Sequence, residues 1–414
     1  MTSQPAILYL SYDGMTDPLG RSQVLPYLAG LAARGHAIEL VSLDKPDALA
    51  RDGARVAELS RAAGIAWTPL AYRSFPPIAA GWRNVAALRR AGAAIMRRMP
   101  VQLIHCRSDL AGIAGLALKR RCGLPLLYDM RALWPDERAE GGAWDQSKPL
   151  YRALLRHFKR RQRELVERAD AIVVLADAAR DLLPALGLRP PTIVETIPCC
   201  ADFDHFTLPD PATRAARRAE LGVGAAPLLL HLGSIGGNVM LGEMLDFLAV
   251  WRGHHPGAQI LFLAPSGGDQ IAAAAAARGL ADAVILRSAG RETVPTWIGA
   301  ADLGLLFVRP VPSKRAASPT KLAEMLAVGL PVVANAGIGD VAAILRDTGA
   351  GVMIDRFDPA AYDTAITALA AMPSDPATIR DRARVHLDLD LGVERYDTLY
   401  RRLAPHPSRK PNIA

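Results

Sequence analysis

The stretch of sequence that decides the fold is Ser318-Pro-Thr-Lys-Leu-Ala-Glu-Met-Leu-Ala-Val-Gly-Leu-Pro-Val-Val-Ala-Asn335. Ser318 is expected to cap a helix, and Pro319 to occupy its first position, where a missing N–H does little harm. Gly329 can take the left-handed conformation that ends the helix, and the β-branched pair Val332-Val333 then favours a buried strand. A helix that leads directly into a strand is a unit of a parallel α/β sheet.

The start of this predicted helix is suited to binding an anion. A phosphate would meet the positive end of the helix dipole, the Lys321 side chain and the free backbone N–H groups of Thr320, Lys321 and Leu322. Glu324, one turn further along, would suit sugar hydroxyls. Any α/β protein contains capped helices followed by strands, so spacing alone leaves a purely structural interpretation open.

Apolar runs alternate with helical patterns along the whole chain, which predicts an α/β fold with two doubly wound parallel sheets. A glycine turn from Asp13 to Gly20 follows the first strand, with a helix from about Ser22 to Arg34. A second glycine turn contains Gly233, Ser234 and Gly236 and opens the second half. Strands are expected at 7–11, 38–43, 103–106, 126–129, 171–175 and 192–197, and then from 228 and at 260–263, 283–286, 303–307, 331–334 and 351–354.

Length and composition set further bounds. A chain of 414 residues with 50% hydrophobic residues is long enough for two domains. The first strand begins too early to leave room for a secretory signal, and no apolar run reaches about 18 residues, so a soluble cytoplasmic protein is expected. The four cysteines show no paired CxxC spacing, which predicts reduced thiols and no zinc site.

The net charge of +8 is unevenly distributed. Residues 1–200 carry 28 Lys and Arg against 19 Asp and Glu, whereas residues 201–414 carry 21 against 22. The basic excess is concentrated in two helical patterns, at 83–98 and 152–163. It is either an ordinary solvated helix face or a surface attracted to anionic lipid or to a diphosphate-linked acceptor. Nucleic acid is not expected as a partner, because aromatic residues do not interleave with these basic runs.

The segment Glu324-Met-Leu-Ala-Val-Gly-Leu-Pro-Val332 resembles the donor-binding block of the retaining GT-B glycosyltransferases of family four. In that family a pair of glutamates eight positions apart contacts the donor. The first would fall at Ala316 here, so only the ribose-binding role of Glu324 is implied. The resemblance implies a GT-B fold, with two facing doubly wound Rossmann-like domains and the ligands in the cleft between them.

Further segments extend the resemblance over nearly the whole chain. Tyr128-Asp-Met-Arg-Ala-Leu-Trp-Pro-Asp-Glu-Arg138 resembles a block found in a bacterial polysaccharide-type branch of the family. It implies that Arg131 contacts the donor phosphates and that Asp136 or Glu137 contacts an acceptor hydroxyl, although a salt-bridged loop is the alternative. Arg107 occupies a position where many members carry histidine, and it joins the expected catalytic residues. His105, beside it, is more often a core residue than a catalyst.

Most members also place an arginine after the first glycine of the second domain and a lysine slightly later. Ser234 and Asn238 cannot supply that positive charge. The compensating cations are therefore expected among Arg291, the pair Lys314-Arg315, and Lys321. The residues expected to bind the donor are Gly20, Gly233, Ser234, Gly236, Arg291, Lys314, Ser318, Thr320, Lys321 and Glu324.

The domain boundaries follow from the same resemblance and from changes in composition. An N-terminal acceptor-side domain is expected over 1–195, a linker over 196–206 and a donor-binding domain over 207–385. A helix over 386–404 would cross back to the first domain, followed by a disordered tail over 405–414.

The predicted function is the transfer of a sugar from a nucleotide-diphosphate sugar to a hydroxyl of a glycan, glycolipid or lipid-linked acceptor, with retention of configuration. Neither a cofactor nor a metal is expected, because arginine and lysine can neutralise the leaving diphosphate. The protein would lie in the cytoplasm, with the inner membrane face as a second possible location. A GT-B nucleotide-sugar epimerase and a non-catalytic sugar-nucleotide-binding relative are the alternatives.

Overall fold

The structure is a computed structural model that describes residues 5–372 and 375–404. The chain divides into two compact units. Of the described residues, the first contains 5–198 together with 389–404, and the second contains 199–372 together with 375–388. The tail predicted over 405–414 lies outside the described residues.

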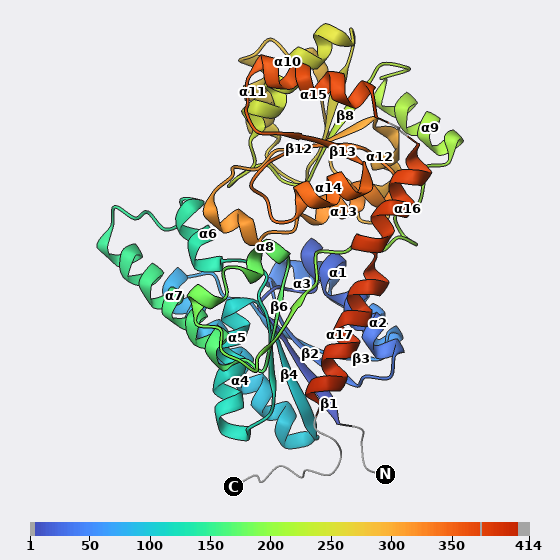
Figure 1. Ribbon diagram of the computed structural model, residues 1–414. Coiled ribbons are helices and arrows are strands. Elements are labelled where there is room, and N and C mark those ends of the chain that lie inside the picture. The colour runs from blue at the N-terminus through green and yellow to red at the C-terminus, as the bar shows by residue number, and fades with distance from the viewer. Residues whose placement is uncertain (1–4, 373–374, 405–414) are drawn as a thin grey trace. The chain divides into compact units, whose positions relative to one another are not determined.

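The first unit is built on a seven-stranded parallel sheet in the order β3-β2-β1-β4-β5-β6-β7. Helices cover both of its faces (Figure 1), with α4, α5 and α7 on one face and α2, α3 and α17 on the other. The strands are β1 (Ala6–Ser11), β2 (Ile38–Asp44), β3 (Ile65–Ala71), β4 (Val101–Arg107), β5 (Leu126–Asp129), β6 (Ala171–Val174) and β7 (Ile193–Thr196). The helices are α1 (Pro18–Gln23), α2 (Leu25–Ala33), α3 (Pro46–Ala62), α4 (Pro77–Arg98), α5 (Ser108–Cys122), α6 (Trp134–Glu140), α7 (Pro149–Arg168), α8 (Asp177–Arg180) and α17 (Leu389–Leu403), with a short turn η1 (Pro184–Leu186).

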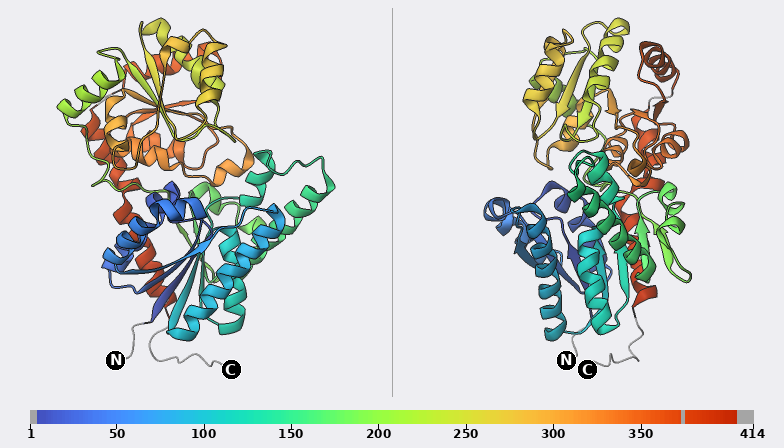
Figure 2. Two further views of the ribbon diagram at one scale, coloured as in Figure 1. Left: turned by 180° about the vertical axis from the view of Figure 1, so that it is seen from behind. Right: turned by 90° about the vertical axis from the view of Figure 1, so that its left-hand side faces the viewer.

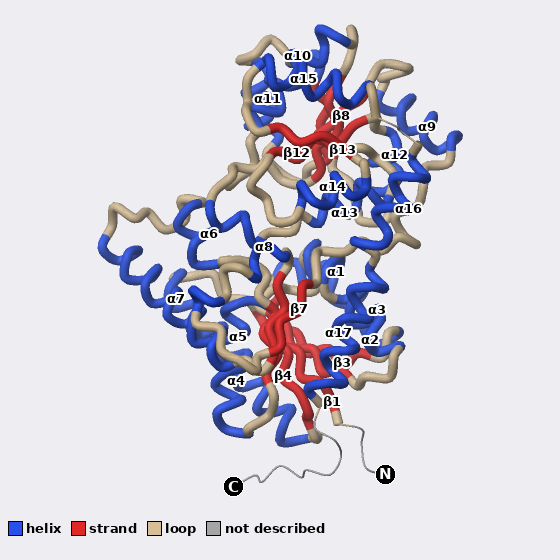
Figure 3. Tube along the Cα trace, in the orientation of Figure 1, coloured by secondary structure: helices blue, strands red, loops and turns tan. Residues whose placement is uncertain are grey.

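The second unit contains a six-stranded parallel sheet in the order β10-β9-β8-β11-β12-β13, again with helices on both faces (Figures 2 and 3). The strands are β8 (Leu228–Leu232), β9 (Gln259–Leu263), β10 (Val284–Arg287), β11 (Leu303–Leu306), β12 (Val332–Asn335) and β13 (Gly351–Ile354). The helices are α9 (Pro211–Leu221), α10 (Leu241–His254), α11 (Gly268–Ala276), α12 (Val294–Ala300), α13 (Thr320–Ala327), α14 (Val341–Thr348), α15 (Pro359–Ala370) and α16 (Pro376–Leu387), with short turns η2 (Ala281–Ala283) and η3 (Pro312–Ala316).

The predicted fold class is confirmed, and every expected strand is present within two residues of its expected bounds. One strand of the described chain was not predicted, β3. It contains Pro69, lies at the edge of the sheet and is only partly buried along most of its length. Its sequence therefore lacks the apolar run of a central strand, and proline is tolerated because an edge strand need not donate to a second neighbour.

The first glycine turn also differs from the prediction. A helix already begins at Pro18, so Gly20 lies inside α1 rather than in a loop before a helix at Ser22. A Cβ atom at residue 20 would stand 2.2 Å from the carbonyl oxygen of Gly14. Gly20 therefore permits close packing of backbone against backbone within the unit.

Candidate functional site

The segments expected to bind the donor meet at the carboxyl edge of the second sheet. The glycine turn follows β8, the segment leading into α13 follows β11, and β8 and β11 are neighbours. Connections from these two strands run in opposite directions along the sheet, so this edge is the switch point of the sheet. Switch points are the usual ligand sites of doubly wound sheets.

Lys321 lies directly against this glycine turn. A Cβ atom at residue 233 would stand 3.3 Å from Nζ of Lys321. Gly233, Gly236 and Gly237 have φ angles of +100°, +145° and +59°, which residues with side chains rarely adopt. The sequence thus keeps the turn free of side chains at the point where the Lys321 ammonium group approaches it.

Glu324 shares this partly buried environment. Burial raises the pKa of Glu324 to about 7, while the charges of Arg291 and Lys321 act in the opposite direction. Burial also lowers the pKa of Lys321 to about 8, an effect that Glu324 partly offsets. The structure therefore brings together three of the expected residues, and two of them change charge near neutral pH.

The helix start differs in detail from the prediction. Pro319 is the N-cap of α13 and makes no side-chain capping bond, so the assignment of Ser318 as N-cap was wrong. The Ser318 hydroxyl instead accepts a 3.1 Å hydrogen bond from the backbone N–H of Cys199. Leu322 N–H was also expected to be free, but it donates to the carbonyl oxygen of Pro319. The backbone N–H groups of Thr320 and Lys321, which head the helix, make no bond to another described residue.

Three other residues of the second unit are close to these segments in sequence. Ala316 is 2% exposed, so a core methyl group stands where the first glutamate of the resembled motif would be. Lys314 lies in η3, and its carbonyl oxygen accepts from the Gly339 N–H. The Ser234 hydroxyl accepts a long 3.4 Å bond from the Ser266 hydroxyl.

In the first unit, two of the four residues expected to be catalytic, Arg107 and Arg131, form an ion-pair network around Asp129. Arg131 Nη1 lies 3.3 Å from Asp129 Oδ1, and Arg107 Nη1 lies 3.6 Å from Asp129 Oδ2. Arg107 Nε also donates to Asp13 at 3.2 Å. Burial alone would raise the pKa of Asp129, but Arg131, His105 and Arg107 hold it well below its usual value.

These contacts agree with the alternative of a salt-bridged loop. The role of Arg131 toward donor phosphates and the catalytic role of Arg107 stay predictions. His105 is buried and its Nδ1 lies 2.7 Å from the hydroxyl of Tyr400, as expected of a core histidine. Asp136 forms a 2.6 Å ion pair with Lys159, and Glu137 lies in the first turn of α6.

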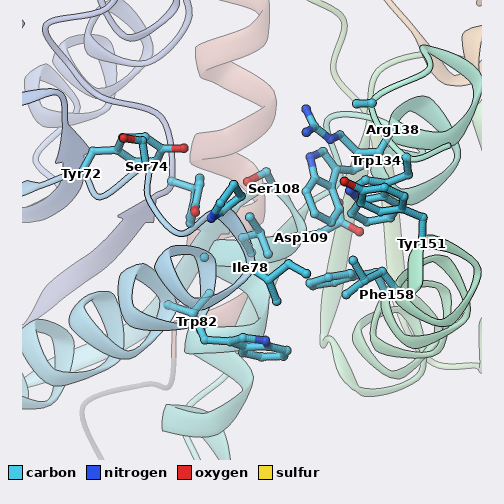
Figure 4. A pocket seen from close by; sticks show the side chains of 18 of the residues that line it. Tyr72, Ser74, Ile78, Trp82, Ser108, Asp109, Trp134, Arg138, Tyr151 and Phe158 are labelled. Atoms are coloured by element: carbon cyan, nitrogen blue, oxygen red, sulfur yellow. The ribbon is translucent and has the colours of Figure 1, made fainter. Parts of the chain in front are cut away.

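The sequence interpretation missed a cavity of about 570 Å³ in the first unit. Aromatic side chains from α4, α6, α7 and the loops between them line it, and Ser108 and Asp109 lie among them (Figure 4). The sequence does contain one indication of this cavity, the aromatic residues that recur between Trp134 and Phe158. Only the charged residues of that segment entered the prediction. Among the described residues, no cluster of His, Cys, Asp and Glu suited to a metal was found, and no helix is long and apolar enough to cross a membrane.

Comparison with solved structures shows the same fold. The sucrose-phosphate synthase of Thermosynechococcus elongatus superimposes with a TM-score of 0.72 at 18% identity, over 97% of this chain and 99% of that chain. The Anabaena protein HepE, solved in complex with UDP-glucose, superimposes with a TM-score of 0.70 at 15% identity, over 96% of this chain and 100% of that chain.

Sequence comparison gives more specific relationships. A D-inositol 3-phosphate glycosyltransferase of Geodermatophilus obscurus is 29% identical over 282 residues, which are 65% of this chain and 59% of that protein. The chain thus spans about three fifths of the length of this curated relative. Residues 21–200 match the model of the glycosyl transferase 4-like domain, and residues 237–372 match that of the glycosyl transferases group 1. With two parallel Rossmann-like sheets, the chain belongs to the GT-B glycosyltransferases of family four.

Proposed function

We propose that the protein transfers a sugar from a nucleotide-diphosphate sugar to an acceptor hydroxyl. The observation that carries this proposal is the meeting of Lys321, Glu324 and the glycine turn at Gly233 at the switch point of the second sheet. A carboxylate there can accept from ribose hydroxyls, while an ammonium group and free N–H groups neutralise a diphosphate. The names of the relatives and the UDP-glucose complex of HepE support it, and they do not favour the epimerase or the non-catalytic alternative.

The donor is tested by a thermal-shift panel of UDP-, GDP-, ADP- and dTDP-sugars. A ligand that binds only the folded state adds about 2.7 kcal/mol to the free energy of unfolding when its concentration is about a hundred times its Kd. The melting temperature rises as a result. We expect one base to give a shift that the others do not match at equal concentration. If none of the four raised the melting temperature, the proposal would fail.

We further propose that the leaving diphosphate is stabilised without a metal ion and that the anomeric configuration is retained. The developing negative charge must be neutralised by groups already in place. Lys321 is held at the glycine turn. Arg291 follows β10 and lies close enough to Glu324 for its charge to oppose the rise in pKa that burial causes. Retention is supported by the resemblance of the Glu324 block to retaining enzymes.

Replacement of either cation should slow turnover. We expect Lys321→Met and Arg291→Met each to reduce kcat by about ten- to a thousandfold, comparable with the loss of one preorganised donor. Release of nucleoside diphosphate from the donor identified above measures the rate. Arg252→Met is the matched control, because Arg252 pairs with Asp282 on the outside of the same unit. Activity should survive EDTA, and rescue of a chelated enzyme by Mg²⁺ or Mn²⁺ would contradict the metal-free mechanism.

The affinity for the donor should depend on pH with a maximum between pH 7 and 8. Glu324, with a pKa raised to about 7, becomes an acceptor as the pH rises, and this change by itself contributes about a tenfold tightening between pH 6 and 8. Lys321, with a pKa lowered to about 8, loses its charge above that pH and binding weakens again. A nucleotide sugar is the right ligand, because its diphosphate does not titrate in this range.

Calorimetric titration across this range separates the two contributions. Glu324→Gln should remove the rise in affinity between pH 6 and 7, and Lys321→Met should remove the fall in affinity above pH 8. Glu220→Gln, at the exposed end of α9, should leave the pH dependence of the affinity unchanged. A profile that stays bell-shaped in both variants would show that other groups control binding.

We also propose that the first unit docks on an anionic membrane face. Exposed basic side chains line α4 and α7, namely Arg89, Arg90, Arg97, Arg98, Lys159 and Arg160. Such residues contribute about 1 kcal/mol each near an anionic surface, and salt weakens the attraction.

Co-sedimentation with anionic vesicles should therefore be strong at low salt and lost at about 1 M salt, where the Debye length is about 3 Å. The double change Arg89→Glu with Arg90→Glu should reduce it more than the double change Arg51→Glu with Arg55→Glu on α3, which alters the net charge equally. Equal binding to anionic and zwitterionic vesicles would contradict the proposal, and the basic residues would then be an ordinary solvated helix face.

A further inference from the structure

The cavity in the first unit lies at the switch point of its own sheet. Its lining includes Tyr12 and Asp13 after β1, Ser108 and Asp109 after β4, and Trp134 after β5. β1 and β4 are the neighbours from which connections run in opposite directions. Its volume of about 570 Å³ is in the range of small-molecule sites, and every lining residue belongs to this unit.

One wall of the cavity is a continuous aromatic surface. Phe158 on α7 stacks on Trp82 of α4 and on Trp144, with ring centroids 5.9 and 5.6 Å apart. Trp134 packs edge-on against both Trp144 and Phe158, at 5.4 and 5.0 Å. These stacked and edge-on contacts hold the rings against one another, so the wall is formed by packing within the unit.

The apolar surface continues outward from this wall into solvent. Ile78 and Trp82 line the cavity and are each 41% exposed. Phe75 is 80% exposed and Leu150 is 56% exposed, and each adjoins a lining residue in sequence, Ser74 and Tyr151. Half of the large hydrophobic residues that the described chain exposes are therefore gathered at this mouth, and such concentration marks an interaction site.

The inner part of the cavity is polar and bears carboxylates. Asp109 is buried and its Oδ1 accepts a 2.8 Å hydrogen bond from Gln162, while Asp13 is held by Arg107. Ser108, at the start of α5, has a φ angle of +74°, the one positive value among the described residues other than glycine. Strained backbone of this kind is found at ligand sites, where the surrounding structure enforces it.

We propose that this cavity binds the acceptor and that the acceptor is a glycolipid, with sugar hydroxyls toward Asp13, Ser108 and Asp109 and a hydrocarbon chain along Ile78, Trp82 and Phe158. The inference rests on the proposed function and names its acceptor class. Asp13 is already paired with Arg107, and burial raises the pKa of Asp109 to about 7, so neither group adds an uncompensated negative charge at neutral pH. The Arg138 guanidinium also lines the cavity, and together these groups offer hydrogen-bond acceptors and donors to the hydroxyls of a sugar. The exposed apolar mouth lies between helices that carry the basic residues described above, as a chain anchored in an anionic membrane requires.

Tryptophan fluorescence offers a direct test, because three of the six tryptophans of the chain line the cavity. The probe is an octyl glucoside whose chain carries bromine, which quenches tryptophans that it contacts. We expect saturable quenching below the micellar concentration. Octyl glucoside should compete at least about tenfold better than methyl glucoside, since each buried methylene adds roughly fourfold in affinity.

Matched variants locate the probe. Quenching should fall in Trp82→Phe and in Trp144→Phe and stay unchanged in Trp251→Phe, which alters a tryptophan of the second unit. Ile78→Ser should weaken binding about tenfold, whereas Leu59→Ser, at a similarly exposed position on α3, should not. Absence of saturable quenching would overturn the proposal. So would equal competition by methyl glucoside or by inositol 3-phosphate.

The nucleotide-sugar thermal shift, measured on the same preparations, separates this proposal from the proposed function. A nucleotide-dependent shift without quenching would overturn the glycolipid cavity alone. Quenching without any nucleotide-dependent shift would uphold the cavity and contradict the donor site.

Discussion

The candidate site depends on the placement of one charge, the ammonium group of Lys321, against Gly233, the residue of the turn that it approaches. Nζ of Lys321 occupies the space beside Gly233, and burial there lowers the pKa of Lys321 to about 8. The same environment raises the pKa of Glu324 to about 7. A partly buried cation and a carboxylate that is easily protonated are costly for a fold to keep unless a ligand uses them. An incoming diphosphate and ribose would satisfy both.

In the first unit, however, the charged side chains around Asp129 are already paired with one another. Arg107 and Arg131 are already paired with Asp129, and this network holds the pKa of Asp129 well below its usual value. Its hydrophobic groups, by contrast, are left partly exposed around the aromatic cavity. The two units thus offer different chemistry at equivalent edges of their sheets, an electrostatic site in the second and an amphiphilic cavity in the first.

The central strands could be predicted from the sequence because each is a run of mainly apolar residues that the sheet buries on both faces. The edge strand β3 could not, since partial exposure and Pro69 remove that pattern. Lys321 and Glu324 could be chosen as candidates from their positions at a predicted helix start. The aromatic cavity was not, because Trp82 is more than 50 residues from Trp134 in sequence and only the fold brings their helices together. Ser318 shows a further limit, since its hydroxyl is used by Cys199, a partner 119 positions away.

Amide hydrogen exchange in the presence of a saturating nucleotide sugar tests the central claim most directly. If the start of α13 and the glycine turn bind the diphosphate, exchange should slow at Thr320 and Lys321 and in the turn from Ser234 to Gly237, because these N–H groups gain an acceptor. Unchanged exchange in both segments, while the same ligand raises the melting temperature, would place the nucleotide elsewhere and contradict the account.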